Sequence, residues 1–165
     1  MRNREDAAQA RKALLRIADE TADGVFHCRS WGHALDQRTV DALEVIAAHG
    51  PNGKARLCMH PSTAEREQQM LVALSDTCND EIHHHPTKSE TVIWVSGMAT
   101  HRTYDESGRV LRETLLGPED ARYVHTEQGV PHNVVVRSDV FVFWEFALGP
   151  FLPGSTVPHV FGERS

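Results

Sequence analysis

The sequence lacks any apolar run long enough to cross a membrane, because its longest run, residues 140–148, is interrupted by Glu145. Its first residues also lack the apolar stretch of a secretory signal, so we expect a cytoplasmic protein with no membrane partner. Cysteine is scarce as well. The three cysteines show no Cys-x-x-Cys spacing, which argues against both a disulfide framework and a thiolate zinc site.

Positive charge is also in the minority. The 165 residues include 23 acidic and 17 basic side chains, for a net charge of -6, and no stretch concentrates lysine and arginine. Phosphate backbones would therefore be repelled, so we expect no nucleic-acid partner. A small anionic substrate remains compatible with the sequence, since a bound metal or a local positive group outweighs a modest global charge.

Apolar periodicity divides the chain into a helical part and a strand-rich part. Helical spacing predicts amphipathic helices at residues 5–20 and 38–49, the second ended by Gly50 and Pro51, with a connector at residues 21–35. Short alternating or β-branched segments follow, and they predict nine strands. These strands are expected at residues 55–60, 69–74, 81–85, 91–96, 99–104, 110–116, 121–125, 132–136 and 140–148.

Many short strands without intervening helices indicate a mainly all-β fold, an antiparallel β-sandwich or small barrel with one or two N-terminal helices. We expect one structural domain in three parts. The parts are a helical extension at residues 1–50, a β-barrel at residues 51–152 and a coil at residues 153–165.

The most informative pattern is the tract His83, His84 and His85, followed by Glu90 and Gly97. On an extended strand His83 and His85 leave the same face, while His84 points the other way. Glu90 lies beyond a turn, from which a second strand can bring its carboxylate back toward both rings. Two neutral nitrogens and one anionic oxygen predict a metal site. The alternative is a surface histidine tract that binds nickel adventitiously.

A fourth ligand has to come from a distant strand, and His132 fits that role. It follows a turn that contains Gly129 and Pro131, and it begins the alternating strand at residues 132–136. Alone, such a residue is more typical of an ordinary turn histidine, but beside the upstream ligands we predict that it binds the metal. Imidazole and carboxylate suit zinc, iron, manganese, nickel or cobalt.

These residues resemble the two motifs of the cupin superfamily, Gly-x5-His-x-His-x(3,4)-Glu-x6-Gly and Gly-x5-Pro-x-Gly-x2-His-x3-Asn. The residues that match the first motif are His83, His85, Glu90 and Gly97, and those that match the second are Gly129 and His132. The chain departs from the motifs at four other positions, Thr77, Ala121, Glu127 and Val136. The resemblance implies a jelly-roll metalloprotein, and none of the departures removes a ligand.

A narrower resemblance covers about residues 38–152. Segments 55–61, 69–71, 83–90, 137–140 and 149–151 are similar to the WbuC-type cupin-fold metalloproteins. Members of that family tend to be associated with O-antigen and other polysaccharide gene clusters. The resemblance therefore implies a role in lipopolysaccharide biosynthesis, with the fold and the metal implied more firmly than the reaction.

Three functions remain open from the sequence. The first is a metal-dependent enzyme that acts on a small sugar or sugar nucleotide in surface polysaccharide metabolism. The second is a non-catalytic, metal-dependent ligand-binding protein, and the third is a non-haem iron dioxygenase. Three histidines and one glutamate leave open positions on the ion, which favours chemistry over a purely structural role.

The sequence provides weak candidates for catalysis. His60, Arg56 and Tyr104 are the principal ones, and His101 and His125 are further candidates for proton transfer. Arg56 lies on the same face of an unbroken strand as His60 and is suited to grip an anionic group.

Alternation also predicts which residues neighbour the metal. If Glu90 faces inward, so should Val92, Trp94 and Ser96. On the last strand, either Val142, Trp144 and Phe146 or Phe141, Phe143 and Glu145 face inward, and the sequence does not decide between the two sets. The N-terminal helices and the many strand edges favour a homodimer.

Overall fold

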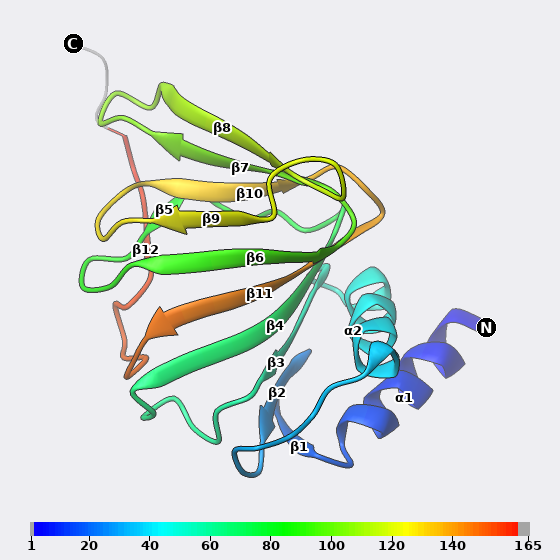
Figure 1. The fold of residues 1–165 in the computed structure, drawn as a ribbon. Helices are drawn as coiled ribbons and strands as arrows, with labels where there is room; N and C mark the ends of the chain where they lie inside the picture. Colours follow the sequence, from blue (N-terminus) through cyan, green and yellow to red (C-terminus); the bar gives the residue numbers. More distant parts are fainter. Residues whose placement is uncertain (1, 162–165) are drawn as a thin grey trace.

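The computed structural model describes residues 2–161, which form two facing β-sheets with two helices on the outer side of the larger one (Figure 1). This arrangement confirms the predicted β-sandwich with N-terminal helices. The seven strands of the larger sheet are, in order, β1 (Ala18–Ala22), β2 (Val25–Cys28), β3 (Lys54–Cys58), β4 (Glu67–Ser75), β11 (Val140–Leu148), β6 (Glu90–Ser96) and β9 (Tyr123–Thr126). The five strands of the smaller sheet are β12 (Val157–Pro158), β5 (His83–His84), β10 (His132–Val136), β7 (Ala99–Tyr104) and β8 (Val110–Leu116).

The two helices pack on each other and against the outer face of the larger sheet (Figure 1). They are α1 (Arg2–Leu14) and α2 (Gln37–His49). The Asp36 side chain caps the start of α2 by accepting from the Thr39 N–H, and the Gly50 N–H closes its end on the Ile46 carbonyl. The predicted end of this helix is therefore confirmed. Neither helix in the described range is long and apolar enough to cross a membrane.

The structure corrects the prediction for residues 5–35. The first helix ends at Leu14 instead of continuing to residue 20, and the expected connector contains β2. Ile17 and Ala18 fit helical spacing, but Ala18 begins β1, which pairs with β2. Strand β2 in turn pairs in parallel with β3. Strand β2 therefore depends on a distant partner, and β1 on β2, so local periodicity does not reveal either short strand.

The C-terminal tail also differs from the expected coil. Residues 157 and 158 form β12, which pairs with β5 at the edge of the smaller sheet (Figure 1). A two-residue edge strand tolerates Pro158, because its position needs no donor toward a further strand. The tail therefore lies next to the histidine tract.

Side chains alternate between the two faces of the larger sheet and so contribute to two separate hydrophobic cores. Residues such as Leu71 and Val142 face the helices, whereas Val72 and Phe143 face the smaller sheet. On β11 the inward set is thus Phe141, Phe143 and Glu145, which decides the question that the sequence leaves open.

Strand β6 departs from strict alternation near its end. Val92 is buried between the sheets as predicted, but the hydroxyl of Ser96 donates to Glu44 on α2, on the opposite side of the sheet. The pairing of β6 with β11 shifts register between Val142 and Phe143, and this irregularity changes the face on which Ser96 emerges.

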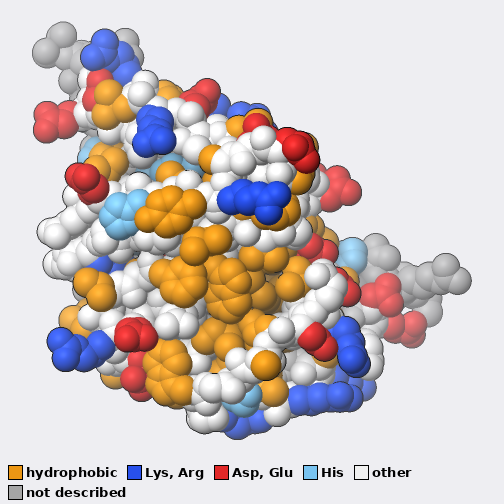
Figure 2. Space-filling model, in the orientation of Figure 1, with side chains coloured by type: hydrophobic (Ala, Val, Ile, Leu, Met, Phe, Trp, Pro, Cys, Tyr) orange, Lys and Arg blue, Asp and Glu red, His pale blue; other side chains and the backbone are white. Residues whose placement is uncertain are grey.

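Apolar side chains gather on the outer face of the larger sheet, beyond the area that the helices cover (Figure 2). Trp144 and Phe146 stack there with ring centroids 5.9 Å apart, and Ile93 lies opposite Trp144 on the neighbouring strand. The helices therefore shield only part of this face.

Candidate metal centre

Three imidazoles from two strands of the smaller sheet and the loop after β5 converge between the sheets. His132 of β10 lies opposite His83 of β5 in the strand register, and their ring centroids are 4.5 Å apart. The ring of His85 lies 5.2 Å from that of His83 and 5.3 Å from that of His132. His84 points away and meets His159 instead, at 5.1 Å. The alternation expected of an extended tract is therefore observed.

Backbone carbonyl groups orient all three rings in the same way. Each Nδ1 donates to a carbonyl oxygen, so each Nε2 remains as the ligand atom. The acceptors for His83, His85 and His132 are the carbonyl oxygens of Glu81, Ser155 and Val130, at 2.8, 2.9 and 2.8 Å. This second layer of hydrogen bonds is typical of metal-binding histidines, whose tautomer and orientation it determines.

Glu90 approaches the same point from the opposite sheet. Its Oε2 lies 3.0 Å from Nε2 of His85, and its Oε1 lies 3.7 Å from Nε2 of His132. Burial by itself would raise the pKa of Glu90, but the adjacent His132 and His85 rings hold that pKa well below its usual value. The site thus contains an anionic oxygen at neutral pH. Burial lowers the pKa of His132, but the nearby charge of Glu90 outweighs it and raises that pKa above its usual value.

These four residues fit a divalent transition metal. The ligand atoms of the three histidines lie within 4.8 Å of one another, and Nε2 of His132 is buried without a hydrogen-bond partner among the described residues. At 3.7 Å its attraction to Glu90 is electrostatic, so the nitrogen still lacks a partner that a cation would provide. Three nitrogens and one carboxylate suit zinc, iron, manganese, nickel or cobalt.

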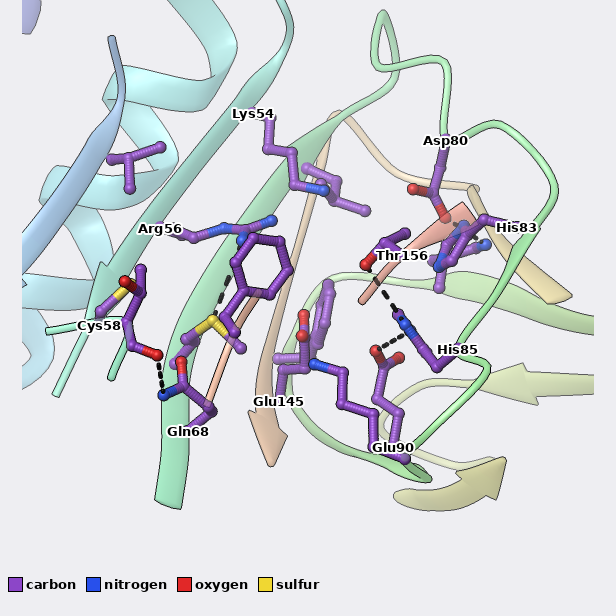
Figure 3. Close-up of a pocket in the computed structure, with 18 of the residues that line it drawn as sticks. Lys54, Arg56, Cys58, Gln68, Asp80, His83, His85, Glu90, Glu145 and Thr156 are labelled. Atoms are coloured by element: carbon purple, nitrogen blue, oxygen red, sulfur yellow. Dashed lines mark hydrogen bonds and ion pairs between the residues drawn. The ribbon is translucent and has the colours of Figure 1, made fainter. Parts of the chain in front are cut away.

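A cavity of about 670 Å³ opens beside this cluster, between the two sheets (Figure 3). His83, His85, Glu90 and His132 form one side of it. The remaining wall comes mainly from β2, β3, β4, β11, the tail and the loops that contain Asp80 and Lys88. The charged or ionisable residues of that wall include His27, Lys54, Arg56, Cys58, His60, Asp80, Lys88 and Glu145.

Comparison with known proteins supports the fold. A family model described as a domain of unknown function, DUF6016, matches residues 35–116. No curated protein matches the sequence. Among solved structures, protein SO0799 from Shewanella oneidensis is similar, with a TM-score of 0.55 and 12% identity over 66% of this chain and 75% of that one.

Two further structures have longer chains. The capsular polysaccharide assembling protein CapF from Staphylococcus aureus is similar with a TM-score of 0.50 and 22% identity, over 56% of this chain and 26% of that one. Oxalate decarboxylase from Bacillus subtilis has a TM-score of 0.48 and 21% identity, over 64% of this chain and 27% of that one. The chain thus spans only about a quarter of these two proteins. It has the cupin fold.

The cupin-fold cavity is lined by cationic side chains that form no ion pair with a carboxylate among the described residues. Among the described residues, the Arg56 guanidinium has only the Met70 sulfur, at 3.9 Å, as a hydrogen-bond partner, and the Lys88 ammonium lies 5.5 Å from the Phe151 ring centroid. Within residues 2–161 neither these two side chains nor Lys54 forms an ion pair with a carboxylate. Figure 3 shows Lys54 and Arg56 pointing into the cavity. Lys88 is only 6% exposed, so an anion in the cavity would be strongly attracted.

Only some of the catalytic candidates predicted from the sequence line the cavity. Arg56 and His60 line the cavity. Tyr104 does not, and its buried hydroxyl donates to Asn133 at 2.8 Å. The exposed His125 contacts Thr91, which is also outside the cavity lining.

Two ionisable residues of this cupin-fold cavity, Lys88 and Glu145, were not predicted from the sequence as charged residues of the site. Lys88 lies inside the histidine motif, where it reads as a turn residue. Glu145 interrupts an apolar strand in the sequence, and this interruption is the signal that could have identified it as a residue of the cavity. Burial raises the pKa of Glu145, and the charge of nearby Glu90 raises it further. Its carboxyl group is therefore suited to holding a proton.

His101 lies behind the cluster, stacked on His132 with ring centroids 5.6 Å apart. Burial, and next the charge of His132, lowers the pKa of His101 to about 4. Because the unfolded chain binds this proton near pH 6.5, the neutral ring stabilises the fold above that pH, and the contribution is lost as the pH falls toward 4. When the pH is lowered from about 7 to about 4.5 in the presence of a chelator, the free energy of unfolding should fall less for His101→Gln than for wild type. The expected difference is on the order of 2 kcal/mol. Urea denaturation at both pH values measures this difference.

His125→Gln provides the control for this prediction, because His125 is an exposed histidine. Its acid dependence should match that of wild type. If His101→Gln also matches wild type, the buried ring titrates normally and the prediction is wrong.

Proposed function

We propose that His83, His85, Glu90 and His132 bind a divalent transition metal, and that the protein is a metal-dependent enzyme acting on a small anionic sugar derivative. The main support for this proposal is that two features face each other across one cavity. One side presents the four ligand groups, and the other presents Lys54 and Arg56, neither of which forms an ion pair with a carboxylate among residues 2–161 (Figure 3). A substrate with an oxygen for the metal and a phosphate or carboxylate for the cations would satisfy both.

Each group has a distinct task in this proposal. A metal held by His83, His85, Glu90 and His132 would supply Lewis acidity for polarising a carbonyl or hydroxyl oxygen of the sugar. Arg56 and Lys54 bind the anionic group and so orient the substrate. Glu145 faces the same space, and its raised pKa lets the carboxyl group carry a proton that it exchanges with the substrate. The reaction class is therefore proton transfer next to a polarised oxygen, as in an isomerisation or epimerisation.

The sugar class rests on the resemblance to the WbuC-type proteins, whose genes tend to lie in polysaccharide clusters. We propose on this basis that the substrate is a sugar phosphate or a nucleotide sugar of lipopolysaccharide or other surface polysaccharide synthesis. The likeness to a capsular polysaccharide assembling protein agrees with this assignment. The positive cavity wall independently favours the phosphorylated form over a neutral sugar.

Replacing Arg56 with glutamine tests the substrate class. Metal-loaded protein should bind hexose phosphates or nucleotide hexoses more tightly than the corresponding neutral hexoses. Arg56→Gln should weaken that binding about 10- to 100-fold, since a charge-assisted hydrogen bond contributes roughly 1.5–3 kcal/mol. Isothermal titration calorimetry with a panel of these sugars measures both effects.

Arg66→Gln is the matched control, because it makes the same change of charge at an exposed arginine outside the cavity. It should leave sugar binding unchanged. Equal affinity for neutral and phosphorylated sugars, or equal losses in the two variants, would refute the anionic substrate. Turnover by wild type that disappears in Glu145→Gln, while sugar binding persists, would separate an enzyme from a binding protein.

A further inference from the structure

A second group of metal-ligating side chains lies in the wall of the same cavity, away from Glu90. It consists of His27, Cys58 and His60, whose ligand atoms all lie within 4.8 Å of one another. The parallel pairing of β2 with β3 places His27 opposite Cys58, and His60 follows two residues later along the chain. The proposed reaction does not use any of these three side chains.

His60 is the most constrained member of this cluster. Its side chain is fully buried, and its Nε2 has no hydrogen-bond partner among the described residues. Its Nδ1 lies 3.2 Å from the Gln69 carbonyl oxygen and 3.1 Å from the Gln69 amide nitrogen. In the tautomer that donates to the carbonyl, the Nε2 lone pair is available to a cation. A buried polar group without a partner costs about 1–3 kcal/mol, and a bound cation would remove that cost.

His27 completes the same arrangement from the neighbouring strand. Its Nδ1 donates to the His60 carbonyl oxygen at 3.4 Å, which leaves its Nε2 as the ligand atom. The two rings meet edge to face, with centroids 5.3 Å apart. Backbone carbonyls therefore engage Nδ1 of both histidines, as they do in the candidate metal centre around Glu90.

We propose that His27, Cys58 and His60 form a second metal site, which binds zinc(II) through two imidazole nitrogens and one thiolate. This donor set is softer than that of the first centre, and zinc readily accepts it. Binding exchanges the Cys58 thiol proton for the cation, so one proton is released per zinc ion. All three residues line the cavity, so the fourth position of a tetrahedral ion faces the cavity space.

The two sites would lie on opposite sides of one substrate. Figure 3 shows Cys58 on one side of the cavity and His83, His85 and Glu90 on the other. The absence of Cys-x-x-Cys spacing in the sequence does not exclude this site. Its single thiolate is completed by a histidine from another strand, and only the pairing of β2 with β3 brings the two together.

Cobalt(II) provides a test that needs no variant. We expect chelator-stripped, reduced wild-type protein to develop a thiolate-to-cobalt charge-transfer absorption when it is titrated with cobalt(II). The first centre contains no thiolate, so this absorption reports the second site alone. Wild-type protein that binds cobalt without the absorption would overturn the second site and leave the first centre intact.

Variants then assign the ligands. Cys58→Ser and His60→Gln should each abolish the absorption and lower the zinc stoichiometry from about two to about one equivalent, measured by competition with a chromophoric chelator. His132→Ala should keep the absorption and lose the other equivalent. Cys78→Ser, at a half-buried cysteine outside the cluster, should retain both. Circular dichroism verifies that each variant is folded, and an absorption that survives Cys58→Ser would refute the proposed ligand.

Discussion

Replacing His132 with alanine is expected to lower the affinity of the first centre for a divalent transition metal by about 100-fold or more, because it removes a ligand rather than a supporting residue. The side chain is 1% exposed, and among the described residues its Nε2 has no hydrogen-bond partner. The fold should survive, since the main-chain pairing of β10 with β7 does not depend on the ring. Elemental analysis and chelator competition, in a Cys58→Ser background that removes the second site, measure the loss.

His84→Ala is the control from the same histidine tract. Its ring faces His159 instead of the cluster, so this variant should keep the metal affinity of its parent. Protein must be purified without an immobilised metal column, since free histidines bind nickel. Full occupancy in purified His132→Ala protein would show that this ring is not a ligand, and the proposed function would fail with it.

Replacing Gly97 with alanine should reduce the free energy of unfolding by about 3 kcal/mol or more. Gly97 has a φ of +74°, a conformation that strains an L residue. An added Cβ would also overlap the Val140 carbonyl oxygen and lie 2.7 Å from Oγ of Ser138. This turn links β6 of one sheet to β7 of the other, so relaxation there would disturb the contact between the sheets. Urea denaturation of metal-free protein measures the change.

Gly32→Ala separates the two contributions in that prediction. Gly32 has a φ of +91° but open space where a Cβ would lie, so only the backbone strain, about 1 kcal/mol, is expected. Equal losses in the two variants would show that the close approach to Val140 contributes nothing. The motif glycine would then be explained by its backbone conformation alone.

Local signals in the sequence predicted the second helix and most strands. Gly50 marks the end of α2 as predicted, because capping depends on residues next to the helix, whereas the cap at its start, Asp36, was not predicted. Strands β1, β2 and β12 were missed, because each is short, and because β2 and β12 pair with segments distant in the chain while β1 is held only by its pairing with β2. The first helix was predicted too long for the same reason, since nothing local distinguishes Ile17 and Ala18 from a further helical turn.

The first candidate metal centre could be predicted in part from spacing. His83 and His85 share a face by alternation, and the structure places their rings 5.2 Å apart, with Nε2 of His85 3.0 Å from Glu90. The hydrogen bond from His85 to the Ser155 carbonyl was not predicted, because the sequence of the tail has no helical or strand periodicity. The cluster of His27, Cys58 and His60 was missed because its first member lies on β2, a strand that sequence analysis did not predict.

The sequence by itself determined the alternation of each strand, the types of side chain available to a candidate metal site and the net charge of -6. The tertiary structure decided which face of β11 turns inward, and therefore that Glu145 enters the cavity rather than Trp144. It also decided that Lys54, Arg56 and Lys88 line the same cavity as the histidines. The physical reason is that a period of two relates neighbours within a strand but not one strand to another. Only the packing of two sheets against each other brings their side chains together.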